Sequence, residues 1–594
     1  MTKNRIALKV LVETAYVQYA LFPVLVSVLT AIAWLFGGAC AAWQWWAAVL
    51  LVMPIGFLTL KTWKMRLASF AMLGLFLLLL WSVSSVLWIS CLGEDMPEYH
   101  YPAIRLMTEG WNPVWQSTFG QIADFVKTLG LTEGMFRMPH VAFMPKTLWG
   151  FCATANKFTK DPYCLFAPLI VAVLPVALAR IWMSLSRFVW PVRCFALALV
   201  LVFLPGPYHC IDLIVSVSGV ALVMTMLVAI KDDEWDWMSL FVFSFWMCVA
   251  KQTSCLSCFV FWLFFTAWNV CTRARRTRVV KIFSLGTILF GLFCVTNVSP
   301  YLTSAIHYGH PLYPVYTGDA IRYPANKEIG GDFLCRNEDA AQIGHVGMFV
   351  SSYVSAKLAH AYYKLKLGVK EFEPRCFVWD IEGGSGSQTN IKYRLLIVFS
   401  LMIVLALGDG RLKMFALVVY GALGLVPAET VGYLRYVPWW SVMLIFALMA
   451  IMEWRGVFHK LKPFALFLGV LFFSLIYRKT FWSSIKHFSG EVERSFCARK
   501  ILRESPPSVV YVYYPSCWAD DFAKNGVRSG FSNRFDDNEA NLMLLVREAE
   551  ELRDCQVRTL PQKDYKQSDL DAGFCKFLGD PVFRVDSRYK IRAK

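Results

Sequence analysis

Charged residues are scarce in this chain, and their scarcity excludes most soluble architectures. Asp, Glu, Lys and Arg make up 17% of the 594 residues, whereas hydrophobic residues make up 57%. A typical soluble domain carries about 25% charged residues. The chain also lacks internal repeats and low-complexity tracts, which argues against a repeat array. The composition therefore indicates a polytopic α-helical membrane protein.

Apolar runs of membrane-crossing length recur along the chain, since a spanning helix needs about 20 residues. We count about thirteen, and the stretch from 194 to 271 is the hardest to divide because Pro205, Pro207 and Lys251 interrupt it. The predicted spans are 14–37, 42–60, 67–91, 163–184, 194–208, 211–230, 237–251, 253–271, 280–299, 393–408, 412–429, 437–453 and 461–478. The first run is long and is followed by no small-residue cleavage site, so we expect a retained anchor.

Acidic residues are fewer than basic ones, 42 against 59, which gives a net charge of +17. The excess need not indicate nucleic acid, because membrane proteins collect Lys and Arg in cytoplasmic loops. Basic clusters follow the second, fourth, eighth, tenth and twelfth predicted spans and precede the first. This phase predicts a cytoplasmic N-terminus, with 92–162, 300–392 and 479–594 outside. We expect an integral protein of the bacterial inner membrane with no nucleic-acid partner.

The seventeen cysteines match no zinc-binding spacing. Many lie inside apolar runs, where Cys behaves as a small apolar residue. Six fall on the predicted outer side, where disulfides are permitted but their connectivity cannot be deduced. These are Cys335, Cys376, Cys497, Cys517, Cys555 and Cys575.

The last 116 or so residues differ in kind from the rest, because charges of both signs return after residue 478. Residues 508–514 are β-branched and aromatic and predict a strand, as do residues 582–585. Residues 539–553 predict a helix. We therefore expect a membrane domain over 1–478 and a small extracytoplasmic α/β domain over 479–594. Within the second outer segment, residues 354–367 predict an amphipathic helix on the membrane surface.

Two adjacent carboxylates, Glu94 and Asp95, stand where the third apolar run should meet water. Tyr99 and His100 follow, within a polar segment that we expect to form a short helix on the membrane surface. Ionisable groups at a membrane are costly and commonly functional. The pair is either a candidate general base or the start of a solvated loop.

Cationic candidates lie at other predicted outer junctions. Lys251 separates two apolar runs and is either a cation for a lipid-linked phosphate or a turn lysine that reaches the headgroups. Arg435 suits bidentate phosphate binding but could equally be an ordinary interfacial arginine. His307 and His310 are weak candidates for metal ligands. Each of Asp161 and Asp212 is either a second carboxylate or a helix cap.

Three motifs together resemble the GT-C superfamily of polytopic glycosyltransferases, which includes the protein O-mannosyltransferases and the lipid A aminoarabinose transferase. The first is Asp95 with Tyr-His-Tyr-Pro at 99–102 and Gly-Trp-Asn-Pro at 110–113. The second is Tyr-Gly-His-Pro-Leu-Tyr-Pro at 308–314, with His310 in place of the usual Asn. The third is Arg-Tyr-Val-Pro at 435–438. Lys251 also resembles a lysine that these proteins place after an Ala/Leu-rich span.

The resemblance implies transfer of a sugar from a polyprenyl-phosphate donor to a lipid, glycan or protein acceptor, with inversion at the anomeric carbon. Asp95 is then the general base, with Glu94 as its alternative. Arg435, Tyr436 and Lys251 would bind the donor phosphate, and Tyr99, His100, His310 and Asp161 would line the substrate pocket. No cofactor is certain. Oligosaccharyltransferases of this superfamily use a divalent metal, but no ligand set for one is evident here.

Other classes remain open at this point. One is an O-antigen ligase or polymerase. Another is a transporter or flippase of a lipid-linked or anionic substrate, although such proteins often carry inverted repeats. A third is a non-catalytic scaffold that presents the C-terminal domain.

Overall fold

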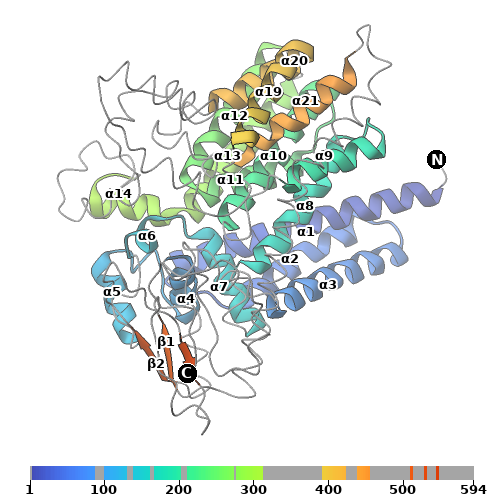
Figure 1. Ribbon diagram of the computed structural model, residues 1–594. Helices are drawn as coiled ribbons and strands as arrows, with labels where there is room; N and C mark the ends of the chain where they lie inside the picture. The colour runs from blue at the N-terminus through green and yellow to red at the C-terminus, as the bar shows by residue number, and fades with distance from the viewer. Residues whose placement is uncertain are drawn as a thin grey trace, which may run out of the picture.

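A computed structural model describes residues 3–86, 99–129, 138–160, 166–202, 210–272, 276–311, 391–422 and 438–454, and three strands near the C-terminus. The described part is mostly helical (Figure 1). Its elements are α1 (Lys3–Leu35), α2 (Trp43–Thr59), α3 (Trp63–Val86), α4 (Tyr101–Glu109), α5 (Phe119–Thr128), α6 (Met138–Phe143), α7 (Thr147–Thr159), α8 (Ala167–Ser184), α9 (Trp190–Val202), α10 (Cys210–Asp232), α11 (Trp237–Ala250), α12 (Gln252–Cys271), α13 (Arg276–Thr296), η5 (Val298–Leu302), α14 (Thr303–Tyr308), α19 (Ile391–Leu407), α20 (Gly410–Gly421), η9 (Pro438–Ser441), α21 (Val442–Glu453), β1 (Val509–Val512), β2 (Arg528–Phe531) and β3 (Leu544–Val546).

Six helices of the described part are long and apolar enough to cross a membrane. They comprise α3, α8, α10, α12 and α13 and most of α1. Five further apolar helices are shorter, at 10–17 residues. Each predicted span from 14–37 to 437–453 overlaps a described helix, although only six of these helices reach membrane-crossing length, and 461–478 lies outside the described residues. The molecule is thus a membrane protein by the length and composition of its helices.

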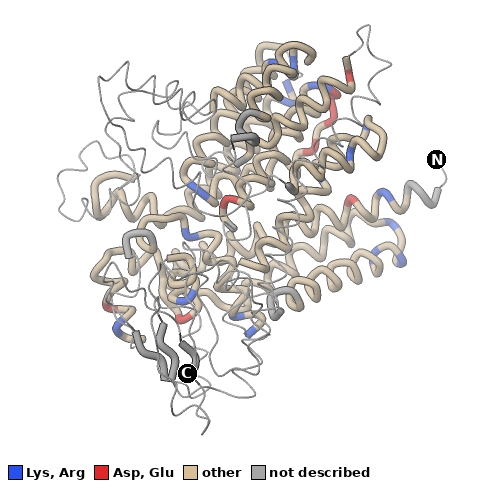
Figure 2. Tube along the Cα trace, viewed as in Figure 1, with Lys and Arg blue, Asp and Glu red and all other residues tan. Residues whose placement is uncertain are grey.

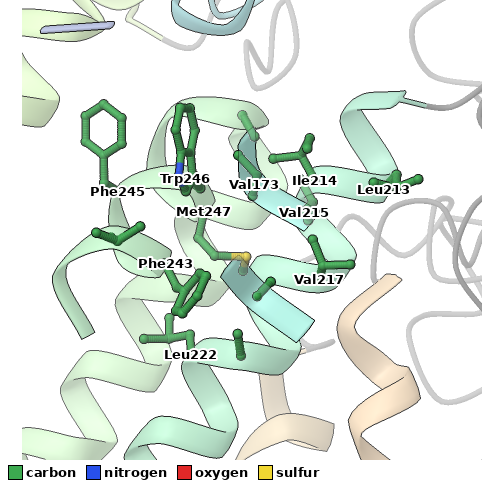
Figure 3. Packing of buried hydrophobic residues seen from close by; sticks show 14 of the residues in the cluster. Val173, Leu213, Ile214, Val215, Val217, Leu222, Phe243, Phe245, Trp246 and Met247 are labelled. Atoms are coloured by element: carbon green, nitrogen blue, oxygen red, sulfur yellow. The ribbon is translucent and has the colours of Figure 1, made fainter. Parts of the chain in front are cut away.

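Helix α10 lies at the centre of the bundle. It packs closely against α8 and α11, and from Asp212 to Val228 its residues are all buried. Aliphatic side chains of α10 interdigitate with Phe243, Trp246 and Met247 of α11 (Figure 3). A span apolar on all sides is expected to be enclosed by other helices. Gly219 permits close approach of η9, because a Cβ there would lie 2.6 Å from the Cβ of Trp439.

A buried polar chain links four helices at one level of the bundle. The Tyr16 hydroxyl of α1 bonds the Ser239 hydroxyl at 2.7 Å, and Ser239 donates to Asp236 at 2.6 Å. Arg180 of α8 pairs with Asp236 at 3.0 Å and donates through Nε to Thr225 of α10 at 2.9 Å. Burying a charge is tolerated when it is paired and hydrogen-bonded. The chain therefore fixes the register of α1, α8, α10 and α11.

An ion-pair network closes one end of the bundle (Figure 2). Arg187 pairs with Asp232 at 2.8 Å and with Glu453, and Lys231 pairs with Asp409 at 2.7 Å and with Glu453. Arg278 donates to the Asp233 carboxylate, with 2.7 Å between Nη2 and Oδ2. Arg411 donates to the carbonyl oxygens of Ile230 and Lys231 at 2.9 and 2.8 Å. We call this set the ionic end. Arg187, Arg278 and Arg411 come from three of the predicted basic clusters, so these clusters meet at one end of the bundle.

Four short helices, α4 to α7, stand between α3 and α8, where the sequence predicts an outer loop. The short helix expected after Tyr99 is present as α4, and Gly110 ends it with φ +113°. It is enclosed by protein, because its residues from Tyr101 to Thr108 are buried except for Arg105, and it packs on α7. Helix α7 itself was not predicted. Its first ten residues are all buried, since the uncharged run from 147 to 156 lets it pack on every side.

The C-terminal region contributes three described strands in the order β2-β1-β3. Strand β1 pairs in parallel with β2 and antiparallel with β3. It lies within the strand predicted over 508–514. The helix predicted over 539–553 is wrong at Leu544–Val546, which form β3. That segment is Leu-Leu-Val, and pairing with β1 decided its conformation over its helical pattern. The strand predicted at 582–585 lies outside the described residues.

Candidate functional site

Of the nine residues to which the resemblance assigns a role, four lie in the described part of the chain: Tyr99, His100, Lys251 and His310. Glu94, Asp95, Asp161, Arg435 and Tyr436 lie outside it. The structure therefore shows the surroundings of Tyr99, His100, Lys251 and His310. The roles expected of the other five stay predictions.

Lys251 occupies the break between α11 and α12. Its backbone is extended, with φ −153° and ψ 147°, so it interrupts what would otherwise be one apolar helix. Its Nζ lies 2.5 Å from the Asp212 carboxylate in the first turn of α10. The Lys251 side chain is 17% exposed and that of Asp212 is 5% exposed. Lys251 is thus a largely buried ion-paired residue and not a freely snorkelling one.

The Asp212 carboxylate pairs with Lys251. A lysine in a low-dielectric setting keeps its charge only if a nearby anion or hydrogen bonds compensate for desolvation. Asp212 supplies that anion from a neighbouring helix.

His100 is held in an aromatic setting at the start of α4. The indole Nε1 of Trp149, on α7, donates to His100 Nδ1 at 2.9 Å. The Tyr99 ring lies 4.2 Å from the His100 ring between centroids, and the Phe166 ring stands edge-on at 5.4 Å. His100 is buried, with 7% of its surface exposed. The expected pocket residues Tyr99 and His100 are therefore fixed by packing from α7 and α8.

Lys146 is a cation that the sequence analysis missed. It is fully buried just before α7, and its Nζ donates to the carbonyl oxygen of Ala142 at 2.9 Å and to that of Met144. The Nζ also lies 5.3 Å from the ring centroid of Trp149. Burial lowers the pKa of Lys146 well below its ordinary value. One signal was available: Lys146 is the single charged residue between Arg137 and Lys157.

The Gly110–Pro113 element acts as an anchor. The Asn112 side-chain amide donates to the carbonyl oxygens of Trp34 and Gly38 at 2.9 and 2.8 Å, and its Oδ1 accepts from the backbone N–H of Val114. Trp34 lies in the last turn of α1, and Gly38 lies just after that helix. Asn112 therefore ties the loop after α4 to the first membrane helix and holds α4 in place.

His307 and His310 lie at the C-terminal end of α14, and His307 is exposed. Within the described ranges, no group of three or more His, Cys, Asp or Glu side chains could hold a metal ion. The two histidines therefore do not form a metal site with the acidic and thiol groups that the structure describes.

The Lys251–Asp212 pair and the His100 cluster lie at the same end of the bundle, opposite the ionic end. Helix α10 begins beside Asp212 and ends at the ionic end, and α11 runs the opposite way to finish at Lys251. Helix α13 begins at the ionic end, and the carbonyl oxygen of its last residue, Thr296, accepts from Thr147 of α7 at 2.9 Å. We call this second end the site end. The fold gathers there residues that are more than 150 positions apart in the chain (Lys251 and His100).

The chain matches no protein-family model, and neither a curated protein nor a solved structure shows significant similarity to it.

Proposed function

We propose that this protein is a membrane glycosyltransferase that moves a sugar from a polyprenyl-phosphate donor to an acceptor at the site end. One observation supports the proposal most: Lys251 and His100, which the resemblance singles out in separate parts of the chain, are both largely buried and hydrogen-bonded at one end of the bundle. The third motif, 435–438, leads directly into η9, and η9 packs on α10. Charged groups are retained at such cost mainly where they act on a ligand.

The proposed reaction is a direct displacement. An acceptor oxygen attacks the anomeric carbon while the bond from that carbon to the donor phosphate oxygen breaks. The acceptor proton passes to Asp95, and the lipid phosphate leaves with the electron pair. Glu94 is the alternative base. Lys251 and Arg435, with Tyr436, stabilise the negative charge that develops on the phosphate. Inversion at the anomeric carbon follows from a single displacement.

Asp212 has a defined part in this scheme. It keeps Lys251 charged before the donor arrives, so the cation is already in place when negative charge develops on the phosphate. Preorganised charges of this kind cost no reorganisation during the reaction. Tyr99 and His100, with His310 and Asp161, line the sugar or acceptor pocket in this proposal.

The proposal includes a wider topology. The chain would cross the bacterial inner membrane about thirteen times, with the ionic end in the cytoplasm and the site end outside. Residues 479–594 would form an extracytoplasmic α/β domain. Labelling of Cys517 by an impermeant thiol reagent on intact cells is the expected result. Labelling of Cys517 only after the cells are lysed would contradict this orientation. Denatured protein serves as the control that the Cys517 thiol can react.

Activity is tested with purified protein in detergent and polyprenyl-phosphate sugars as donors. The rate at which the sugar–phosphate bond of the donor is cleaved is measured for the wild type, Asp95→Asn and Lys251→Met. We expect Asp95→Asn to lose at least about a hundredfold in kcat, the usual contribution of a general base. The matched control is Asp124→Asn, since Asp124 is an exposed residue of α5. Wild-type turnover by Asp95→Asn would exclude Asp95 as the base.

A transporter is the second candidate, and one observation favours it. The central helix α10 carries an ion pair at each end, Asp212 with Lys251 and Lys231 with Glu453. Paired charges within a membrane domain commonly mark a substrate or ion pathway. A transporter would move labelled substrate across vesicles while the sugar–phosphate bond stays intact. The enzyme would cleave that bond in detergent, where no gradient exists.

A further inference from the structure

A hydrogen bond from Trp149 determines which nitrogen of His100 carries a proton. The indole Nε1–H is a donor only, and it lies 2.9 Å from His100 Nδ1. Nδ1 must therefore be the unprotonated nitrogen, which leaves the proton of the neutral ring on Nε2. A flipped ring would put a carbon against the indole N–H, and a carbon cannot accept it. The tautomer thus follows from the chemistry of the partner.

The indole is itself held rigidly. Lys146 Nζ lies over its face, and that amine is fixed by the carbonyl oxygens of Ala142 and Met144 at the end of α6. Trp149 is fully buried within α7, and α7 is tied to α13 through Thr147 and to α4 through Asn156, whose Nδ2 lies 3.2 Å from Thr108 Oγ1. The donor is therefore preorganised by three neighbouring elements.

The surroundings leave the His100 ring little freedom to turn. Phe166 stands edge-on against it and Tyr99 lies against its other side. Among the described residues of the elements that pack here, the charged groups are few. Lys146 contacts Trp149, Arg105 pairs with Glu109 at 2.7 Å on α4, and Lys157 lies on α7. The Trp149 contact thus acts on the ring directly, whereas the charges act at a distance.

We propose that Trp149 is a positioning residue that fixes His100 as the Nε2–H tautomer, so that His100 serves the site as a hydrogen-bond donor to an oxygen atom and not as a proton acceptor. The ligand class is an oxygen-rich one, such as a sugar hydroxyl or a phosphate oxygen. The proposed glycosyl transfer supplies such ligands. The role of His100 as a donor to the ligand therefore rests on the proposed function. The tautomer itself does not depend on any activity.

The tautomer is tested by nitrogen NMR of the full-length protein with ¹⁵N-labelled histidine rings. The His100 signal is assigned by its loss in His100→Gln. We expect one bare and one protonated ring nitrogen at about pH 8, with the proton on Nε2. In Trp149→Phe we expect a mixture of the two neutral tautomers. A protonated Nδ1 in the wild type would overturn the proposal.

The matched control is Trp45→Phe. Trp45 is also fully buried and its indole Nε1 also donates to α7, to Thr154 Oγ1 at 3.0 Å. This variant loses a similar hydrogen bond on the same helix without touching His100. We expect its His100 signals to match those of the wild type. If Trp45→Phe alters them as much as Trp149→Phe does, the effect is general loosening of α7 and the proposal is wrong.

The role of His100 is tested by two substitutions. Glutamine can place an amide N–H near the former Nε2, whereas asparagine is too short and reaches only the Nδ1 position. We expect His100→Gln to keep sugar transfer within about fivefold of the wild type and His100→Asn to lose more than that, since one hydrogen bond is worth about a fivefold change in rate. Equal loss in both variants would contradict the donor role of His100. An inactive wild type would refute the glycosyltransferase proposal but leave the NMR result to decide the tautomer.

Discussion

The two ends of the helical bundle use charge in opposite ways. At the ionic end, Arg187, Lys231 and Glu453 each have two ion-pair contacts, and the network joins α10, α21 and the segments before α9 and α20. At the site end, Lys251 and Asp212 form a deeper pair, and Lys146 is buried against backbone carbonyl oxygens. A shared, half-exposed network tolerates the loss of a member. A buried pair does not, because removing one partner strands a charge.

The largest expected effect is at the site end. Lys251→Met removes the ammonium from beside a carboxylate that is 5% exposed. We expect a loss of about 3–5 kcal/mol in the free energy of unfolding, measured by chemical denaturation in detergent. Adding Asp212→Asn should restore part of it. The control is Lys9→Met, whose exposed pair with Glu13 should be worth about 0–0.5 kcal/mol. Equal free energies of unfolding for Lys251→Met and Lys9→Met would show that the buried pair at the site end contributes no more than an exposed surface pair.

Packing at the site end gives the next effect. Gly219→Ala places a methyl group against Trp439 of η9, at 2.6 Å from its Cβ. We expect a loss of about 1–3 kcal/mol from the overpacked contact, read as a lowered thermal unfolding midpoint. Gly286→Ala is the matched control, because nothing lies within 4 Å of that position in α13. It should gain up to about 1 kcal/mol. A neutral Gly219→Ala would mean that η9 moves freely relative to α10.

A smaller effect is expected at the ionic end. Glu453→Gln weakens contacts with both Arg187 and Lys231, but Arg187 keeps Asp232 and Lys231 keeps Asp409. We expect a loss of about 1–2 kcal/mol in the free energy of unfolding, reduced further by salt because these groups are partly exposed. A loss as large as that of Lys251→Met would show that the ionic end is not redundant.

The smallest effect is a pH dependence at Asp409, the N-cap of α20. Partial burial alone would raise the pKa of this carboxyl, but the Lys231 ammonium and the backbone N–H of Leu412 outweigh it and hold the pKa below its usual value. Because the pKa of Asp409 is lower in the folded state, its ionised carboxylate stabilises the folded protein at pH values above the unfolded-state pKa of about 3.9. This stabilisation is lost as the pH falls through the folded-state pKa. The wild type should therefore lose more stability than Asp409→Asn between about pH 5 and pH 3 in unfolding titrations. Parallel curves for the two proteins would contradict this.

The membrane helices could be predicted from local pattern, because hydrocarbon demands long apolar runs. The break at Lys251 was also visible in the sequence, and it separates α11 from α12 as expected. Helix α7 was missed because its signal, a short uncharged run around Trp149, resembles a loop when no partner is known. The helix expected over 539–553 failed at β3 for a related reason, since Leu-Leu-Val fits either conformation and pairing with β1 chose between them.

The sequence by itself determined that this chain is a helical membrane protein and showed where its few charged residues stand. It also showed that the basic clusters follow every second predicted span in most of the chain. These properties depend on composition and spacing, which a linear reading contains. The tertiary structure alone decided that Asp212 pairs with Lys251, that Trp149 bonds His100 and that Lys146 is buried beneath Trp149. The first two contacts join different helices, and the choice among partners depends on packing angles that no single segment encodes.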